Sequence, residues 1–75
     1  MNMIYENETL YVGLTDDNEI NMYEEIRDRI FDVLDIYKVD NIILDTRRYN
    51  NINKRKVHSI KRECTRKYGN YIKIV

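Results

Sequence analysis

Apolar residues recur along this chain at two spacings, which separate predicted strands from predicted helices. Residues 3–5 and 10–14 are rich in apolar side chains and flank a polar break, a pattern that predicts two strands joined by a tight turn. In the second segment Leu10, Val12 and Leu14 alternate with other residues, so all three share one face of the strand. The chain therefore begins with a predicted pair of neighbouring strands.

The next segment, from about 22 to 37, is apolar at every third or fourth residue and predicts an amphipathic helix. Asn21 and Glu24 have the spacing of a capping box, in which each side chain bonds a backbone N–H at the start of the helix. Glu25 and Arg29 are spaced to pair on its exposed side. The apolar face consists of Tyr23, Ile26, Ile30, Val33, Leu34 and Tyr37.

Residues 39–45 form a short predicted strand whose apolar residues are consecutive, which is typical of a strand covered on both faces. The polar residues 46–52 predict a loop. A second helix is expected over about 54–68, because Asn53 suits its N-cap and Gly69 suits the left-handed conformation that ends a helix. The apolar positions of this helix are Val57, Ile60, Cys64 and Tyr68.

Residues 71–75 close the chain as a fourth strand. The resulting order of elements predicts right-handed crossovers and an α/β fold, a mixed and mostly parallel four-stranded sheet with two helices. Residues 1–75 are expected to form a single domain with a thin core. The last strand is expected at an open edge, where Lys73 discourages uncontrolled pairing and where a second copy is one candidate to cover it.

Three segments at matching intervals resemble the STAS domain, the fold of bacterial anti-sigma-factor antagonists. Residues 19–21, Glu-Ile-Asn, resemble the Glu-Ile-Asp before that family's first helix. Residues 41–45, Asn-Ile-Ile-Leu-Asp, resemble its buried strand, and residues 67–75 resemble its helix end, glycine and following strand. The resemblance covers about residues 9–75. It implies the order β-β-α-β-α-β and a regulatory protein partner such as an anti-sigma factor.

The chain departs from that family at the start of the second helix. The family has the motif Asp-Ser-Ser-Gly-Leu there, and a partner kinase phosphorylates one serine. Residues 53–57 read Asn-Lys-Arg-Lys-Val, with Arg55 in the place of that serine, so phosphorylation is not expected. The family also continues with another helix, strand and helix. The chain is therefore expected to be a degenerate relative, truncated on its C-terminal side.

Charged residues are separated between the two parts of the sequence. Residues 1–45 contain twelve acids and three bases, a net of −9, whereas residues 46–75 contain ten bases and the single acid Glu63, a net of +9. The formal net charge of zero conceals this division. Such segregation predicts either a surface that meets an anionic partner or a contact between the two oppositely charged halves.

The predicted binding site combines the loop after the third strand with the start of the second helix. Lys54, Arg55 and Lys56 lie in the first helical turn, where the backbone N–H groups already present positive charge. Backbone donors and cationic side chains would converge there on an anion. The candidate site residues are Arg47, Arg48, Lys54, Arg55, Lys56, His58, Lys61 and Arg62.

These residues predict a non-enzymatic protein-interaction module that binds an acidic protein partner and acts as a regulator. Two alternatives stay open at this point. The same basic surface could bind nucleic acid, although the acids of the other half repel phosphate and no helix-turn-helix or aromatic RNA-binding signature is present. It could also be a solvated face that binds nothing.

No catalytic, metal or cofactor motif is found in the sequence. Cys64 and His58 are six residues apart on a predicted helix and point in different directions, so they do not form a nucleophile–base pair. With only one Cys and one His, a zinc site is not expected unless a second chain contributes ligands. The single cysteine fits a reducing cytosol, and no stretch suits a membrane span or a secretory signal. We therefore expect a cytoplasmic protein without cofactor. Its richness in Ile, Asn, Lys and Tyr suggests a low-GC bacterium or its phage.

Overall fold

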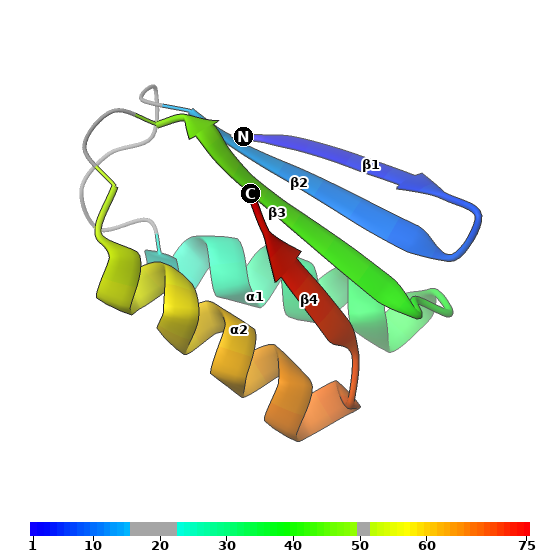
Figure 1. Ribbon diagram of the computed structural model, residues 1–75. Helices are drawn as coiled ribbons and strands as arrows, with labels where there is room; N and C mark the ends of the chain where they lie inside the picture. The colour runs from blue at the N-terminus through cyan, green and yellow to red at the C-terminus, as the bar shows by residue number, and fades with distance from the viewer. Residues whose placement is uncertain (16–22, 50–51) are drawn as a thin grey trace.

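The computed structural model describes residues 1–15, 23–49 and 52–75 and confirms the predicted β-β-α-β-α-β fold (Figure 1). The elements are the strands β1 (Asn2–Glu6), β2 (Thr9–Thr15), β3 (Asn41–Arg48) and β4 (Tyr71–Ile74), and the helices α1 (Tyr23–Ile36) and α2 (Lys54–Tyr68). The predicted cap residue Asn21 lies outside the described residues. Within the described residues, no helix is both long enough and apolar enough to cross a membrane.

The four strands form one mixed sheet in the order β1-β2-β3-β4. β1 and β2 are antiparallel, whereas β2, β3 and β4 run parallel to one another. Asn7 and Glu8 connect β1 to β2 with φ angles of 51° and 61°, the left-handed conformation that a two-residue hairpin turn of type I′ requires. β4 is an edge strand, as the sequence predicted.

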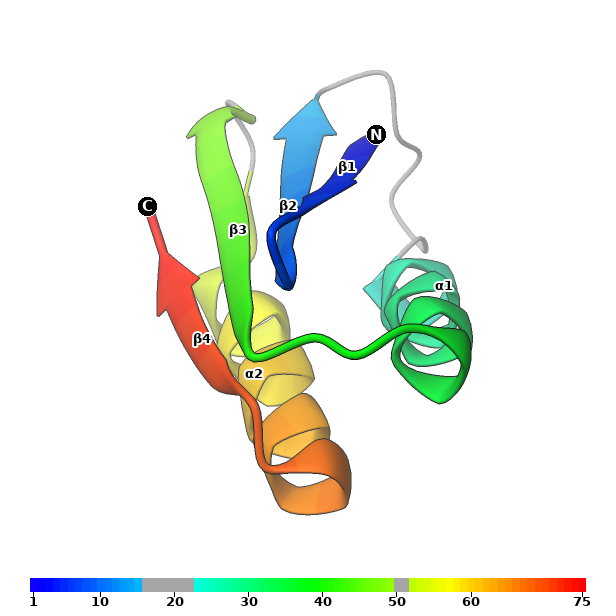
Figure 2. The same ribbon diagram turned by 90° about the vertical axis from the view of Figure 1, so that its right-hand side faces the viewer.

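Both helices cover the same face of the sheet, and the core lies between the two layers (Figures 1 and 2). The strands contribute Leu10, Val12, Leu14, Ile42, Leu44 and Ile72 to this core, and the helices contribute Tyr23, Ile26, Ile30, Val57, Ile60 and Cys64. The predicted apolar stripes of the helices therefore face inward, apart from two tyrosines. Tyr68 of α2 packs against Phe31 of α1, with 5.4 Å between ring centroids. Tyr37 follows the end of α1, is 52% exposed and packs against Tyr5, with 5.1 Å between ring centroids.

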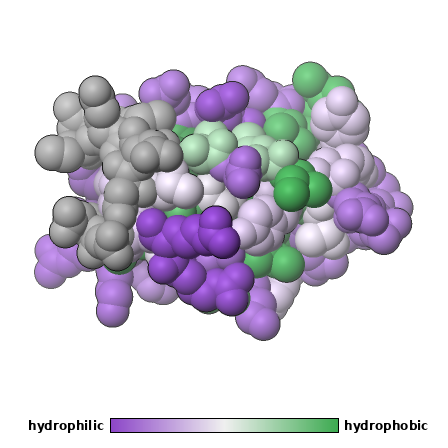
Figure 3. All heavy atoms as spheres, turned by 90° about the horizontal axis from the view of Figure 1, so that it is seen from above, coloured by the Kyte–Doolittle hydropathy of each residue, from purple (hydrophilic) through white to green (hydrophobic). Residues whose placement is uncertain are grey.

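Within the described residues, the other face of the sheet carries no helix, so the prediction that β3 is covered on both faces is wrong. Ile43 lies on this open face in register with Tyr11, and Ile4 on β1 is 54% exposed there. Viewed from above, hydrophobic and hydrophilic residues are interspersed on the side of the molecule formed by the sheet (Figure 3). The apolar run in β3 is long because its residues on both faces are apolar, although only one face is packed.

The strand β3 also extends three residues further than predicted, into the segment that the polar sequence indicated to be a loop. Thr46 donates its backbone N–H to the carbonyl oxygen of Val75 at 2.7 Å, and Val75 donates to Leu44 at 3.0 Å. Arg48 is paired with Thr15 after a register shift in the β2–β3 ladder. Pairing with distant strands therefore keeps these polar residues extended, and the shift has the character of a β-bulge.

The two ends of α2 follow their local sequence signals. The side chain of Asn53 accepts a hydrogen bond of 3.2 Å from the backbone N–H of Lys56, and Asn53 itself is extended, as an N-cap should be. Gly69 has a φ of 72° and donates its N–H to the carbonyl oxygen of Thr65 at 2.8 Å. These caps fix where α2 begins and therefore which residues its surface presents.

Candidate protein-interaction surface

The exposed side of α2 carries a line of arginines. An α-helix turns 100° per residue, and Val57, Ile60 and Cys64 define the direction that points into the core. The opposite direction is occupied by Arg55, Arg62 and Arg66, which are all exposed. We refer to these three arginines, together with the exposed His58 beside them, as the basic stripe.

Arg66 was missed in the sequence-based set of site residues, although the signal was available. Its spacing of four from Arg62 and eleven from Arg55 places all three on one helical face. In the structure Arg62 and Arg66 line one shallow depression with Ser59 and Glu63. Arg62 also lines a second depression, with Lys54, Arg55 and His58. The stripe therefore runs along most of α2 instead of ending in its first turn.

Two other predicted site residues of α2 lie on its flanks. Lys56 turns toward α1, where its Nζ lies 5.4 Å from the ring centroid of Tyr23. It lines the groove between the helices, together with Glu24 and Arg27. Lys61 is half-buried, one residue beyond the core residue Ile60. The expected cluster in the first turn is therefore reduced to Lys54 and Arg55.

The two arginines of β3 do not join the cations of α2. Arg47 and Arg48 line a depression on the open side of the sheet, with Tyr11 and Gly13. Arg47 donates from Nε to Oδ1 of Asp45 at 3.0 Å and from Nη2 to Oδ2 at 2.8 Å, a bidentate ion pair. Arg47 therefore lies apart from the basic stripe, and the carboxylate of Asp45 balances its charge.

Asp45 is the centre of a polar cluster that the sequence did not reveal. Besides the Arg47 side chain, it accepts a hydrogen bond from the Tyr11 hydroxyl at 2.7 Å and one from the backbone N–H of Arg47 at 3.0 Å. The Arg47 guanidinium, followed by the Tyr11 hydroxyl and the Arg47 N–H, holds the pKa of the Asp45 carboxyl far below its usual range, although burial opposes this. Both carboxylate oxygens of Asp45 thus accept hydrogen bonds from groups of the same chain.

Gly13 makes room for this arrangement. It is paired with Asp45 across the two strands, and the ring of Tyr11 lies over it. A Cβ at position 13 would come within 3.2 Å of the Tyr11 ring and hydroxyl, closer than ordinary van der Waals contact. The lack of a side chain at Gly13 therefore lets the Tyr11 hydroxyl reach Asp45.

The exposed side of α1 is acidic. Tyr23, Ile26 and Ile30 point into the core, so the outward direction is occupied by carboxylates. We refer to these exposed residues as the acidic stripe: Glu24, Glu25, Asp28, Asp32 and Asp35. Because α1 and α2 lie side by side on one face of the sheet (Figure 2), the acidic and basic stripes are neighbours on one surface.

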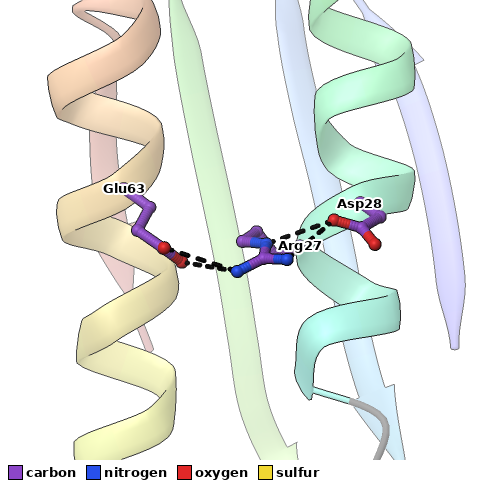
Figure 4. Close-up of polar contacts among 3 residues, drawn as sticks. All are labelled: Arg27, Asp28 and Glu63. Carbon is purple, nitrogen blue, oxygen red and sulfur yellow. Dashed lines mark hydrogen bonds and ion pairs between the residues drawn. The ribbon is translucent and has the colours of Figure 1, made fainter.

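One ion pair joins α1 to α2 at the seam, the line along which the two helices meet. In this pair the acidic helix supplies the cation and the basic helix supplies the anion. Arg27 of the acidic helix lies with Nη1 3.3 Å from Oε2 of Glu63 of the basic helix, and its Nη2 lies 3.0 Å from Oδ1 of Asp28 (Figure 4). Hydrogen bonds with Asp28 and then with Glu63 raise the pKa of the Arg27 guanidinium. The ion pairs at the seam therefore use none of the cations of the basic stripe.

The cations of the basic stripe are not neutralised in this way. Among the residues that the structure describes, the ion pairs join Arg27 to Asp28 and Glu63, Lys38 to Glu8, and Arg47 to Asp45. Arg55, Arg62 and Arg66 have no carboxylate partner within this part of the chain. With respect to the described residues, their guanidinium groups are available to form bidentate pairs with another molecule.

The structure places Cys64 in the core and His58 at the surface. Cys64 is buried in the core, as predicted, and its burial is the main reason that its pKa is raised to about 11, with a smaller contribution from the charge of Glu63. His58 is exposed and lies on the basic stripe, about 120° around the helix from Cys64. In residues 1–15, 23–49 and 52–75 no three His, Cys, Asp or Glu side chains are grouped to hold a metal ion.

Comparisons with protein-family models, with curated proteins and with solved structures found no match to this chain. The resemblance to the STAS domain therefore stays a prediction that depends on three sequence segments and on the order of elements. The functional argument consequently depends on the surface of α1 and α2.

Proposed function

We propose that this protein is a non-enzymatic interaction module of the cytoplasm, which binds an acidic surface of a protein partner through the basic stripe of α2. The observation that carries the proposal is the line of Arg55, Arg62 and Arg66, exposed and without a carboxylate partner among the described residues. The STAS-like order of elements supports a regulatory role, with a partner of the anti-sigma-factor kind.

A protein partner is favoured over nucleic acid by the surroundings of the stripe. Nucleic-acid backbones carry closely spaced phosphates, so a binding protein presents a broad positive surface to them. Here the acidic stripe of α1 flanks the basic stripe directly, and its carboxylates would repel phosphates on that side. Arginine also pairs bidentately with carboxylates, which an acidic protein surface supplies.

The proposal is tested by reversing two charges of the basic stripe and capturing partners from a lysate of the source organism. The variant Arg55→Glu with Arg62→Glu should lose the acidic proteins that the unchanged chain retains. The control, Arg29→Glu with Lys73→Glu, changes the net charge equally at exposed positions on α1 and on the open face of the sheet. It should retain them.

Equal capture by both variants would contradict the proposal. Position 55 lies in the first turn of α2, where a carboxylate suits the helix dipole, so we expect this variant to fold. Circular dichroism of both variants verifies this.

Nucleic acid is tested in the same experiment. Binding through phosphates weakens steeply with salt, by a slope close to the number of phosphates contacted. A gel shift with mixed-sequence duplex and single-stranded DNA and RNA at about 50 mM salt should show no complex. A complex that disappears in the Arg55→Glu, Arg62→Glu variant would instead assign the basic stripe to nucleic acid.

A further inference from the structure

The outer surface of the helical layer is divided lengthwise into an acidic half and a basic half. The acidic stripe of α1 contains five carboxylates, and the basic stripe of α2 contains three arginines and His58. The helices run in the same direction, because each one connects parallel strands. When a second copy is rotated by 180° so that its helical layer faces the first, the acidic half of each copy can therefore meet the basic half of the other.

Contacts across the seam show which residues of the two helices lie at the same level. Lys56 lies over Tyr23, Glu63 meets Arg27, and Lys67 lies 4.6 Å from the ring centroid of Phe31. The sequence offset between the helices is therefore 33 to 36 residues. By this offset, Asp28 is level with the region of Arg62 and Asp32 is level with the region of Arg66.

Two kinds of twofold axis could bring two such helical layers face to face. An axis that lies in the interface and runs across the helices would place α1 on α1′ and α2 on α2′, so that like charges meet. An axis parallel to the helices places α1 of one copy on α2 of the other, without moving any residue along the helix. Only the second arrangement brings the acidic stripe onto the basic stripe, and it does so twice, as a twofold interface requires.

We propose that the basic stripe also binds the acidic stripe of a second copy of this chain, helical layer to helical layer, about a twofold axis parallel to the helices. Asp32 of each copy then faces Arg66 of the other, and Asp28 faces Arg62. This inference depends on the part of the proposed function that assigns the basic stripe to an acidic protein surface.

The chemistry of the interface determines how it should behave. Exposed ion pairs between long side chains are individually weak. The outward positions of both helices are charged or polar, apart from Ile36 at the end of α1, which is 76% exposed. Charges on a solvated surface are also screened over about 10 Å at 0.1 M salt. The dimer should therefore form reversibly at high protein concentration and should dissociate as salt rises.

The experiment uses sedimentation equilibrium with the unchanged chain and with two single charge reversals, Asp32→Arg and Arg66→Glu. The unchanged chain should dimerise at about 50 mM salt and lose most of the dimer at about 0.5 M. Each reversal alone creates two like-charge contacts, so its dissociation constant should rise by about tenfold or more. A one-to-one mixture of the two variants restores one opposite-charge pair and leaves the other intact, so a heterodimer should form with about the original affinity.

The mixture also shows that both variants are folded, because only folded chains can restore the contact. The double variant Asp32→Arg with Arg66→Glu should dimerise by itself, with both pairs inverted. A chain that stays monomeric at low salt and at about 0.5 mM protein would overturn the inference, as would reversals that leave the dimer unchanged or a mixture that is not restored.

These outcomes are separable from those of the capture experiment. A monomeric chain that still needs Arg55 and Arg62 to capture an acidic host protein would refute the dimer and keep the proposed function. A dimer that follows the charge reversals, with capture that does not depend on Arg55 and Arg62, would keep the dimer and refute the external partner.

Discussion

The hydroxyl group of Tyr11 donates a hydrogen bond of 2.7 Å to Oδ2 of Asp45, across 34 residues of sequence. The two residues lie on neighbouring strands, and the phenol ring crosses the open space above Gly13 to reach the carboxylate. Arg47 completes the cluster from two residues further along β3. Three residues with polar side chains are thus bound to one another on the sheet face that neither helix covers.

This cluster predicts a specific dependence of stability on pH. The pKa of Asp45 is lowered in the folded chain from an ordinary value of 3.8, chiefly by the Arg47 guanidinium and then by the Tyr11 hydroxyl. A lowered folded-state pKa adds stability at pH values above the unfolded-state pKa, and this stability is lost as the pH falls through the folded-state value. Asp45→Asn should therefore lower the free energy of unfolding at pH 7 by about 1–3 kcal/mol.

Urea unfolding of the Asp45→Asn variant and of the unchanged chain measures this difference. It should shrink as the pH falls from about 4 toward 2, because the carboxylate of the unchanged chain becomes protonated. Asp40→Asn is the matched control, since Asp40 is exposed, and it should change the free energy of unfolding little at either pH. A constant difference between the Asp45→Asn variant and the unchanged chain across this range would show that the ion pair is not its source.

The sequence predicted correctly those parts of the fold whose determining residues lie within a few positions of each other. The limits of α2 were predictable because Asn53 and Gly69 act on backbone groups within a few residues of themselves. The end of β3 was not predictable, because Thr46 is held extended by a hydrogen bond to Val75, 29 residues away. The apolar run in β3 misled for a related reason, since a sequence does not show which face of a sheet its helices cover.

The residues of the candidate site were likewise predictable only where local geometry determines their position. Arg55, His58, Arg62 and also Arg66 follow from helical geometry once the core residues of α2 are known. Arg47 resembled them in charge but is paired with Asp45, and only the strand register shows that Tyr11 reaches the same carboxylate. Charge counts along the sequence therefore indicated a basic half, whereas the structure shows which of its cations are available.

Gly69 should resist replacement for reasons of backbone conformation alone. Its φ of 72° is a left-handed angle, and a Cβ at this position would meet no other atom within 4 Å. A Gly69→Ala variant should therefore lose about 1–2 kcal/mol, the cost of a left-handed non-glycine residue, without any steric clash. Thermal unfolding should show a Tm lower by roughly 4–16 °C for a domain of this size.

The control for this prediction is Gly69→Asn, because asparagine adopts the left-handed conformation more readily than alanine does. It should lose less stability than Gly69→Ala. Equal losses in the two variants would mean that the left-handed angle is not what the glycine provides.

Cys64 should be almost inert toward thiol reagents in the folded chain. It is fully buried in the core, and burial, assisted by the charge of Glu63, raises its pKa to about 11. The thiolate is the reacting species, so at pH 8 an aromatic disulfide reagent should label the native chain at least about a hundredfold more slowly than the chain in urea. Labelling at the same rate in both conditions would show that Cys64 is accessible in the native state.

The ion pair between Arg27 and Glu63 should contribute little to stability, although it joins the two helices. Both side chains are about one-third exposed, at 27% and 33%, so water screens their interaction. Arg27 also keeps Asp28 as a partner, with 3.2 Å from Nε and 3.0 Å from Nη2 to Oδ1, when Glu63 is removed. The coupling between Arg27→Gln and Glu63→Gln in a double-mutant cycle should therefore be only about 0.2–1 kcal/mol.

Salt provides the internal control for this cycle. A screened pair weakens as the ionic strength rises, so the coupling should fall toward zero at about 1 M salt, whereas contributions from packing should persist. The cycle is measured at low protein concentration, where contact between copies does not contribute. A coupling above about 2 kcal/mol, or one that salt does not change, would mean that Arg27 and Glu63 lock the two helices together and that the division of charge between the stripes is maintained by this bridge.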